Sequence, residues 1–101
     1  MEKISENNLD EKLALSGNVI IDFSSPGCAP CKKVPALIED VIKENPEKMI
    51  SAFEVDITES PEVATRFFVL GVPTLIIFKD GNEVVRFNSV PSKNKIVSAL
   101  K

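Results

Sequence analysis

The 101-residue chain contains no histidine, no tryptophan and no tyrosine, and the missing histidine excludes several kinds of chemistry. Without histidine there is no Ser-His or Cys-His nucleophile pair, no imidazole acid or base and no histidine metal ligand. The six phenylalanines are the only aromatic residues. We therefore look for reactive groups among the carboxylates, the amines and the two cysteines.

The chain also lacks an excess of positive charge and a long apolar run. Twelve Lys and Arg against 15 Asp and Glu give a net charge of −3, so no basic face is available for nucleic acid. The longest apolar stretch, residues 69–78, contains glycine, proline and threonine and is too short to cross a bilayer. The first residues do not resemble a signal peptide. We therefore expect a cytoplasmic protein with neither nucleic acid nor a membrane as its partner.

Length and composition predict one domain over residues 1–101. The 44% hydrophobic and 27% charged residues are ordinary for a soluble globular protein. A chain of this length can bury one core of two or three layers but has no room for a separate cofactor domain.

The hydrophobic pattern predicts alternating strands and helices. The apolar, β-branched run at 19–23 is typical of a central strand, and an amphipathic helix follows the cysteines and ends near Asn45. The other predicted elements are a possible edge strand at 2–4, a helix at 8–15, a strand at 49–57, a helix after Ser60 with Val63, Ala64, Phe67 and Phe68 on its inner face, strands at 74–78 and 83–87 joined by Asp80–Gly81, and a last helix from Ser92. This order predicts an α/β fold, with a mixed four- or five-stranded sheet flanked by helices on both faces and the strands 19–23 and 49–57 parallel.

Cys28 and Cys31 are the only cysteines, and they stand where the strand 19–23 gives way to a helix. On a first helical turn this spacing puts both side chains on one face, with Cα atoms about 5–6 Å apart, within disulfide range. A structural disulfide would add little stability because the loop is so small. A zinc site would need a second ligand pair, from a dimer. Reversible dithiol–disulfide chemistry is the favoured interpretation, and no metal is expected.

Two charged residues near the cysteines could influence them. Asp22 lies within the apolar run, where burial would raise the pKa of its carboxyl and let it accept a proton from Cys31. Alternatively, Asp22 lies at the strand end in solvent. Lys32 adds positive charge which, together with the helix N-terminus, favours the thiolate of Cys28.

Several motifs, in order along the whole chain, resemble the thioredoxin family. Cys28-Ala29-Pro30-Cys31-Lys32 is similar to the family's Cys-Gly-Pro-Cys-Lys, and Asp22-Phe23 stands where the family has a buried Asp-Phe pair. Gly71-Val72-Pro73-Thr74-Leu75 resembles its cis-proline segment, and Phe78-Lys79-Asp80-Gly81 resembles its hairpin. A Cys-x-x-Cys motif with both an acidic residue upstream and Val-Pro-Thr downstream is far more specific than the motif alone.

The resemblance implies a thioredoxin fold and a protein-disulfide reductase without a bound cofactor, serving electron transport and cell redox homeostasis. Cys28 would attack a client disulfide, Cys31 would resolve the mixed disulfide, and Asp22 would accept the Cys31 proton. The residues implied to tune the sulfurs or to contact the client are Ala29, Pro30, Lys32, a cis Pro73, Gly27, Gly71 and Val72. The implied partners of the monomer are disulfide-containing client proteins and a thioredoxin reductase, flavin- or ferredoxin-linked.

The chain departs from the family pattern at several positions. Gly27 and Ser24 stand where the family usually has tryptophan, Pro35 lies one residue earlier than the usual helix proline, and Ala52 stands where a buried lysine often faces the aspartate. These differences bear on partner recognition and reduction potential more than on the fold. Two alternatives stay open: a glutaredoxin- or disulfide-isomerase-like member, and a redox-inert module that uses the groove only to bind protein.

Overall fold

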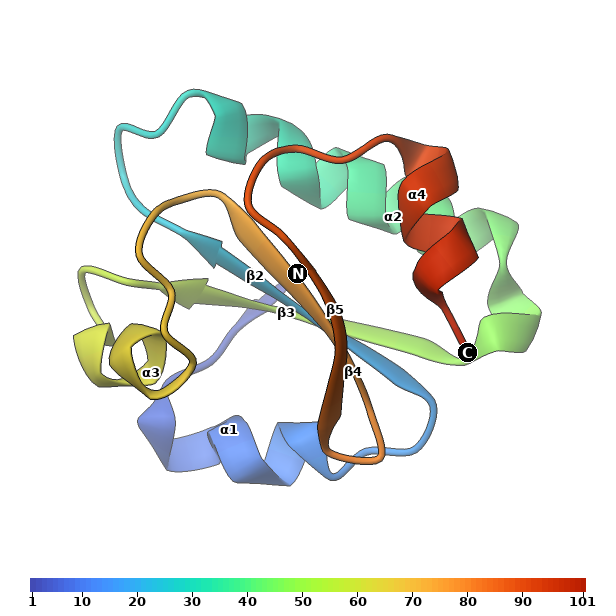
Figure 1. The fold of residues 1–101 in the computed structure, drawn as a ribbon, viewed down its shortest axis with the longest axis horizontal. Helices are drawn as coiled ribbons and strands as arrows, with labels where there is room; N and C mark the ends of the chain where they lie inside the picture. Colours follow the sequence, from blue (N-terminus) through green and yellow to red (C-terminus); the bar gives the residue numbers. More distant parts are fainter.

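The computed structural model describes residues 1–101 and contains one five-stranded sheet in the order β1-β3-β2-β4-β5 (Figure 1). The elements in chain order are β1 (Glu2–Lys3), α1 (Glu6–Leu13), β2 (Asn18–Ser24), the 3₁₀ helix η1 (Pro30–Lys33), α2 (Val34–Glu44), the 3₁₀ helix η2 (Pro46–Lys48), β3 (Ile50–Asp56), α3 (Pro61–Arg66), β4 (Thr74–Lys79), β5 (Asn82–Phe87) and α4 (Lys93–Ala99). The predicted mixed α/β architecture is confirmed, and most boundaries lie within a residue or two of the predicted ones.

β2 is the centre of the sheet, and all of its residues are buried. It pairs in parallel with β3 and antiparallel with β4, and β4 and β5 form the predicted antiparallel hairpin. A strand with neighbours on both edges and helices on both faces needs apolar side chains in both directions, which explains the unbroken apolar run. The edge strand β1 pairs in parallel with β3.

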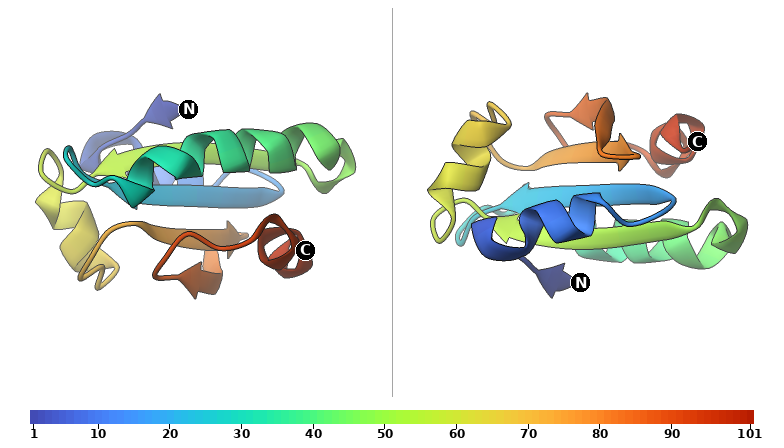
Figure 2. Two further views of the ribbon diagram at one scale, coloured as in Figure 1. Left: turned by 90° about the horizontal axis from the view of Figure 1, so that it is seen from above. Right: turned by 90° about the horizontal axis from the view of Figure 1, so that it is seen from below.

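The sheet separates two apolar clusters because successive side chains of a strand point to opposite faces. Val19, Ile21 and Phe23 pack in one cluster with residues of α1 and α3. Ile20 packs in the other with residues of α2 and α4. Figure 1 shows these helix pairs on opposite sides of the sheet, and Figure 2 shows α2 running along β3 and β2. By the same alternation, Asp22 lies on the face that carries α2 and α4.

The helix α1 begins two residues earlier than the hydrophobic pattern predicts. A capping box explains the difference: the Ser5 backbone N–H donates to Asn8 Oδ1 at 2.8 Å, and the Ser5 hydroxyl accepts from the Asn7 N–H at 3.4 Å. These bonds satisfy backbone donors that the first helical turn leaves free. The first turn is polar, so periodicity alone could not detect it.

The prediction that Phe68 lies on the inner face of a helix is wrong. The side chain is 80% exposed, and the residue has a positive φ of 56°. The chain reverses there: the Phe68 N–H donates to the Thr65 carbonyl, and the Val69 N–H donates to the Ala64 carbonyl at 2.8 Å. This is a Schellman motif, in which the residue after the turn packs back on the helix. Val69 therefore takes the core place expected for Phe68.

None of the helices combines the length and the hydrophobicity that crossing a bilayer requires.

Gly17, which leads into β2, allows a close approach of two backbones. It has a φ of +84°, and a Cβ on it would overlap the Met49 carbonyl oxygen. That oxygen accepts the Asn18 N–H at 3.0 Å, which holds the loop before β3 against the start of β2. Position 17 therefore requires glycine, both because its φ is positive and because a Cβ would have no room beside Met49.

We predict that Gly17→Ala lowers the free energy of unfolding by about 3 kcal/mol, because left-handed strain and steric overlap add. Gly81→Ala is the matched control, since Gly81 has a φ of +80° but a Cβ added to it would meet no atom within 4 Å. It should lose only about 1 kcal/mol, the backbone contribution alone. Urea denaturation of both variants measures the difference, and equal losses would contradict the steric part of the argument.

Candidate active site

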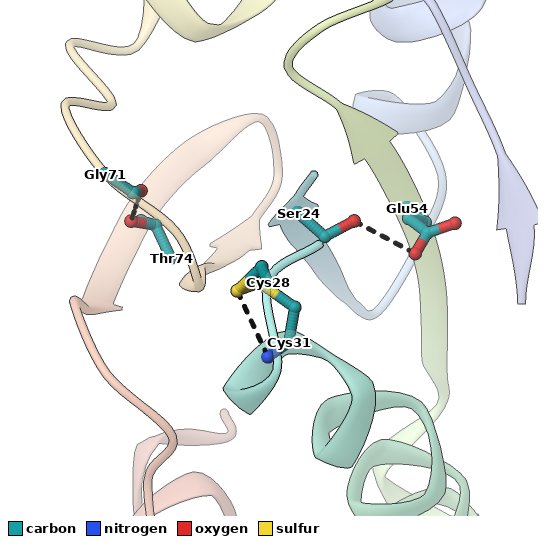
Figure 3. Close-up of a disulfide and its surroundings, with 6 residues drawn as sticks. All are labelled: Ser24, Cys28, Cys31, Glu54, Gly71 and Thr74. Atoms are coloured by element: carbon teal, nitrogen blue, oxygen red, sulfur yellow. Dashed lines mark hydrogen bonds between the residues drawn. A yellow bond between two sulfur atoms is a disulfide. The ribbon is translucent and has the colours of Figure 1, made fainter. Parts of the chain in front are cut away.

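A disulfide joins Cys28 and Cys31 just beyond the carboxyl end of β2 (Figure 3). The Cα atoms are 5.3 Å apart, within the range predicted from the spacing. The expectation that both cysteines lie on a first α-helical turn is wrong in detail. Cys28 lies in the turn before η1, Cys31 lies within η1, and α2 begins only at Val34. The tighter 3₁₀ turn still brings the sulfurs together.

The two cysteines differ in their access to solvent. Cys28 is partly exposed, whereas Cys31 is only 6% exposed. The Cys31 backbone N–H donates to Cys28 Sγ at 3.3 Å. A donor in this position favours negative charge on that sulfur, as does the N-terminal end of a helix. Cys28 is thus both the reachable sulfur and the one with a nearby donor.

Three other predicted residues lie on the surface near the pair. Gly27, Ala29 and Lys32 are all exposed around the disulfide turn. Pro30 is the first residue of η1, where its missing N–H costs nothing. Pro35 lies in the first turn of α2 for the same reason.

A loop before β4 lies across from the disulfide (Figure 3). Its Val72–Pro73 peptide bond is cis. The Thr74 hydroxyl donates to the Gly71 carbonyl at 2.7 Å and so closes the turn. Gly71 is exposed and Val72 is half-exposed, whereas Pro73 is buried. The sequence-predicted groups from residues 27–32 and 71–73 therefore gather at one end of the sheet.

Asp22 is fully buried, so the alternative that it lies at a strand end in solvent is wrong. Neither carboxyl oxygen has a hydrogen-bond partner. Burial, together with the smaller effect of the negative charge of Glu54, raises the pKa of the Asp22 carboxyl to about 7. At that pKa the carboxyl exchanges a proton near neutral pH, which suits an acid–base group.

Ser24 and Glu54 belong to the site, and our sequence reasoning assigned neither a role in it. They line a pocket of about 320 Å³ together with Ser25, Cys28, Cys31, Lys32 and Pro35. The Ser24 hydroxyl donates to Glu54 Oε2 at 3.1 Å. Glu54 follows the polar alternation of β3, which is typical of a solvent-facing residue. No pattern in the sequence marks Glu54, because its place in the site follows from the strand register, in which it lies beside Asp22.

Two large apolar side chains extend the site's surface beyond the predicted residues. Phe68 is 80% exposed and Leu70 is 99% exposed. They line a hollow of about 470 Å³ that also includes Gly71 and Val72 of the cis-proline loop. The two most exposed large hydrophobic side chains of the chain thus adjoin the loop facing the disulfide.

A Cys-x-x-Cys disulfide at the carboxyl end of a central strand, opposite a cis-proline loop, defines the class of thiol–disulfide oxidoreductases with this α/β fold. The thioredoxin profile matches residues 1–101, and the chain belongs to the thioredoxin family. The resemblance stated from the motifs is thereby confirmed.

Individual relatives agree with this membership. The chain is 35% identical to a thioredoxin of Chlamydia trachomatis over 99% of this chain and 95% of that protein. It is 32% identical to a thioredoxin of Staphylococcus haemolyticus, over 97% and 92% respectively. Among solved structures, a mutant thioredoxin from Halobacterium salinarum has the same fold, with a TM-score of 0.87, 22% identity, and coverage of 99% of this chain and 86% of that chain.

We predict that Asp22→Asn changes how stability depends on pH. Because the folded carboxyl binds its proton up to a pKa of about 7 against a reference of 3.8, Asp22 destabilises the fold progressively as pH rises from about 4 to about 7. The free energy of unfolding of Asp22→Asn relative to wild type should rise over that window by roughly 3–4 kcal/mol. Asp40→Asn, the same substitution on the exposed face of α2, is the matched control. Thermal unfolding of the oxidised protein at several pH values tests this, and a flat difference for Asp22→Asn would refute the burial argument.

Proposed function

We propose that the protein reduces disulfides in client proteins by dithiol–disulfide exchange, with Cys28 as nucleophile and Cys31 as resolving cysteine. The observation that carries the proposal is the asymmetry of the pair: the sulfurs are bonded to each other, yet only Cys28 is open to a client. An exposed sulfur can attack from outside, and a buried one can react only with its neighbour.

The proposed reaction has two steps and moves two electrons from the protein to the client. The Cys28 thiolate attacks a client sulfur, the client S–S bond breaks, and the second client sulfur leaves as a thiolate that takes up a proton. The Cys31 thiol then gives its proton to the Asp22 carboxylate, and the Cys31 sulfur attacks Cys28 Sγ. The bond between Cys28 and the client breaks, and the client sulfur leaves as a thiolate that takes up a proton from solvent. The client therefore leaves with two thiols, and the protein keeps the disulfide.

The groups around the sulfurs fit this role. Lys32 and the Cys31 N–H favour the thiolate of Cys28. Ala29 and Pro30, between the cysteines, would tune the reduction potential. No bound cofactor is required, because the two sulfurs carry both electrons.

We further propose that clients bind as extended segments over Gly27, Gly71, Val72 and Pro73. The backbone of the exposed Gly71 and the half-exposed Val72 can pair with such a segment. Leu70 and its neighbour Phe68 enlarge this patch on the side of the cis-proline loop. A patch of this size suits brief contacts with many clients.

The proposed partners follow from the two-electron cycle. A thioredoxin reductase, flavin- or ferredoxin-linked, would return the disulfide to the dithiol. We propose that the protein works as a monomer in the cytoplasm, where thiols are kept reduced and a dithiol can be recharged.

The first test is trapping of the mixed disulfide. Cys31→Ser should accumulate a covalent complex with a disulfide client such as insulin, because the resolving thiol is missing, while Cys28→Ser should accumulate none. Non-reducing gel electrophoresis shows the complex. Complexes formed by Cys28→Ser instead would reverse the roles, and no reduction of insulin by wild type would revive the redox-inert binding module.

The second test separates client binding from sulfur chemistry. Leu70→Ser should raise the KM for a protein client about five- to tenfold, the effect of losing one buried leucine contact. Its rate with a small aromatic disulfide should not change. Leu15→Ser is the control, because Leu15 is 39% exposed and precedes β2 at the opposite end of the sheet. Equal KM values for the two variants would remove Leu70 from the client surface.

A further inference from the structure

Asp22, Ser24 and Glu54 form a polar group on the face of the sheet that carries α2. Asp22 and Ser24 are two residues apart on β2, so their side chains point the same way. Glu54 is the register partner of Asp22 on the parallel strand β3. This end of the sheet therefore holds two carboxylates side by side.

The Ser24 hydroxyl holds Glu54 in this position. Ser24 is 8% exposed, and its only side-chain hydrogen bond goes to Glu54 Oε2 at 3.1 Å. Figure 3 shows this bonded pair on the side of the disulfide away from the cis-proline loop. Glu54 is half-buried and lines the same pocket as both cysteines.

Few other charges can act on Asp22. On β4 its register partner is the apolar Leu75. The residues that α2 and α4 bury on this face are apolar as well. Lys32 of η1 is the other charged residue in the pocket. Where a buried lysine often faces the family's aspartate, this chain has Ala52, so the charged neighbour of Asp22 within the sheet is acidic.

We propose that Glu54 is a positioning residue of the active site: held by the Ser24 hydroxyl beside the sulfur pocket, it acts through Asp22 to control the transfer of the Cys31 proton. The inference rests on the disulfide-reductase function proposed above. Glu54 forms no bond to a sulfur, and the atoms exchanged in the second step stay as described. Its charge changes how strongly Asp22 holds the proton that leaves Cys31, and the proton then passes from Asp22 to solvent.

The charge of Glu54 has opposite effects on the two sides of neutrality. A negative neighbour makes the Asp22 carboxylate a stronger base, which speeds proton removal from Cys31 when Asp22 is ionised. The same neighbour keeps more of Asp22 protonated at lower pH, where a protonated carboxyl cannot accept a proton. Removing the charge should therefore raise the rate in acid and lower it in alkali.

The direct test is an NMR titration of the Asp22 carboxyl carbon in the oxidised protein, with no client present. In Glu54→Gln the midpoint should fall by about 0.5–1 pH unit, because a like charge is removed. In Ser24→Ala it should fall by less, because the charge remains but is no longer held. Glu47→Gln makes the same charge change in exposed η2, beyond the far end of α2, and should leave the midpoint unchanged. An unchanged midpoint in a folded Glu54→Gln overturns the inference.

The kinetic test compares rates of reduction of a small aromatic disulfide in single turnover. Relative to wild type, Glu54→Gln should be about twofold faster near pH 6 and about twofold slower near pH 8. Glu54→Asp keeps the charge and should restore the wild-type profile. A uniform loss at all pH values would mean a merely structural role and overturn the inference. If wild type itself fails to reduce disulfides, the function fails while the titration still reports on the two carboxylates.

Discussion

The structure depends on one constraint, which is that β2 is buried along its whole length. Its side chains meet helices on both faces and its backbone meets strands on both edges, so the strand can lead to solvent only at its two ends. The disulfide turn begins at its carboxyl end. The same burial removes Asp22 from solvent and leaves its carboxyl without a hydrogen bond. A reactive sulfur pair and a high-pKa carboxyl thus arise from a single feature of the core.

The site combines two opposite electrostatic preferences. Around Cys28 a backbone donor and a nearby lysine favour an anion. Around Asp22, burial and the charge of Glu54 disfavour one. In the proposed mechanism, the proton that leaves Cys31 passes to Asp22, whose raised pKa lets it hold a proton near neutral pH. In that mechanism the two preferences act together, because one group loses a proton while another holds it.

Prediction from the sequence succeeded where local pattern and burial agree. The run 19–23 is of strand length and rich in β-branched residues. The residues of α2 repeat with a helical period, and Asp80–Gly81 marks the β4–β5 hairpin. The fold followed from the order of these elements. Prediction failed at Phe68 because a Schellman turn ends α3 within an apolar stretch. The helical spacing of apolar residues continues in the sequence beyond the residue at which the chain reverses. Prediction assigned Glu54 no role, because the polar alternation along β3 does not show which residue of the neighbouring strand lies beside it, and only the register with Asp22 does.

The sequence by itself determined the class of fold, the paired cysteines at the end of a central strand and the membership in the thioredoxin family, because these features are local or depend on the order of elements. Only the tertiary structure decided which cysteine is open, whether Asp22 is buried, and which charge lies beside it. Those properties depend on strand register and on helix placement, which bring together residues such as Ser24 and Glu54, 30 positions apart in the chain. No local pattern carries that information, since it arises only when the sheet forms and its two faces are covered.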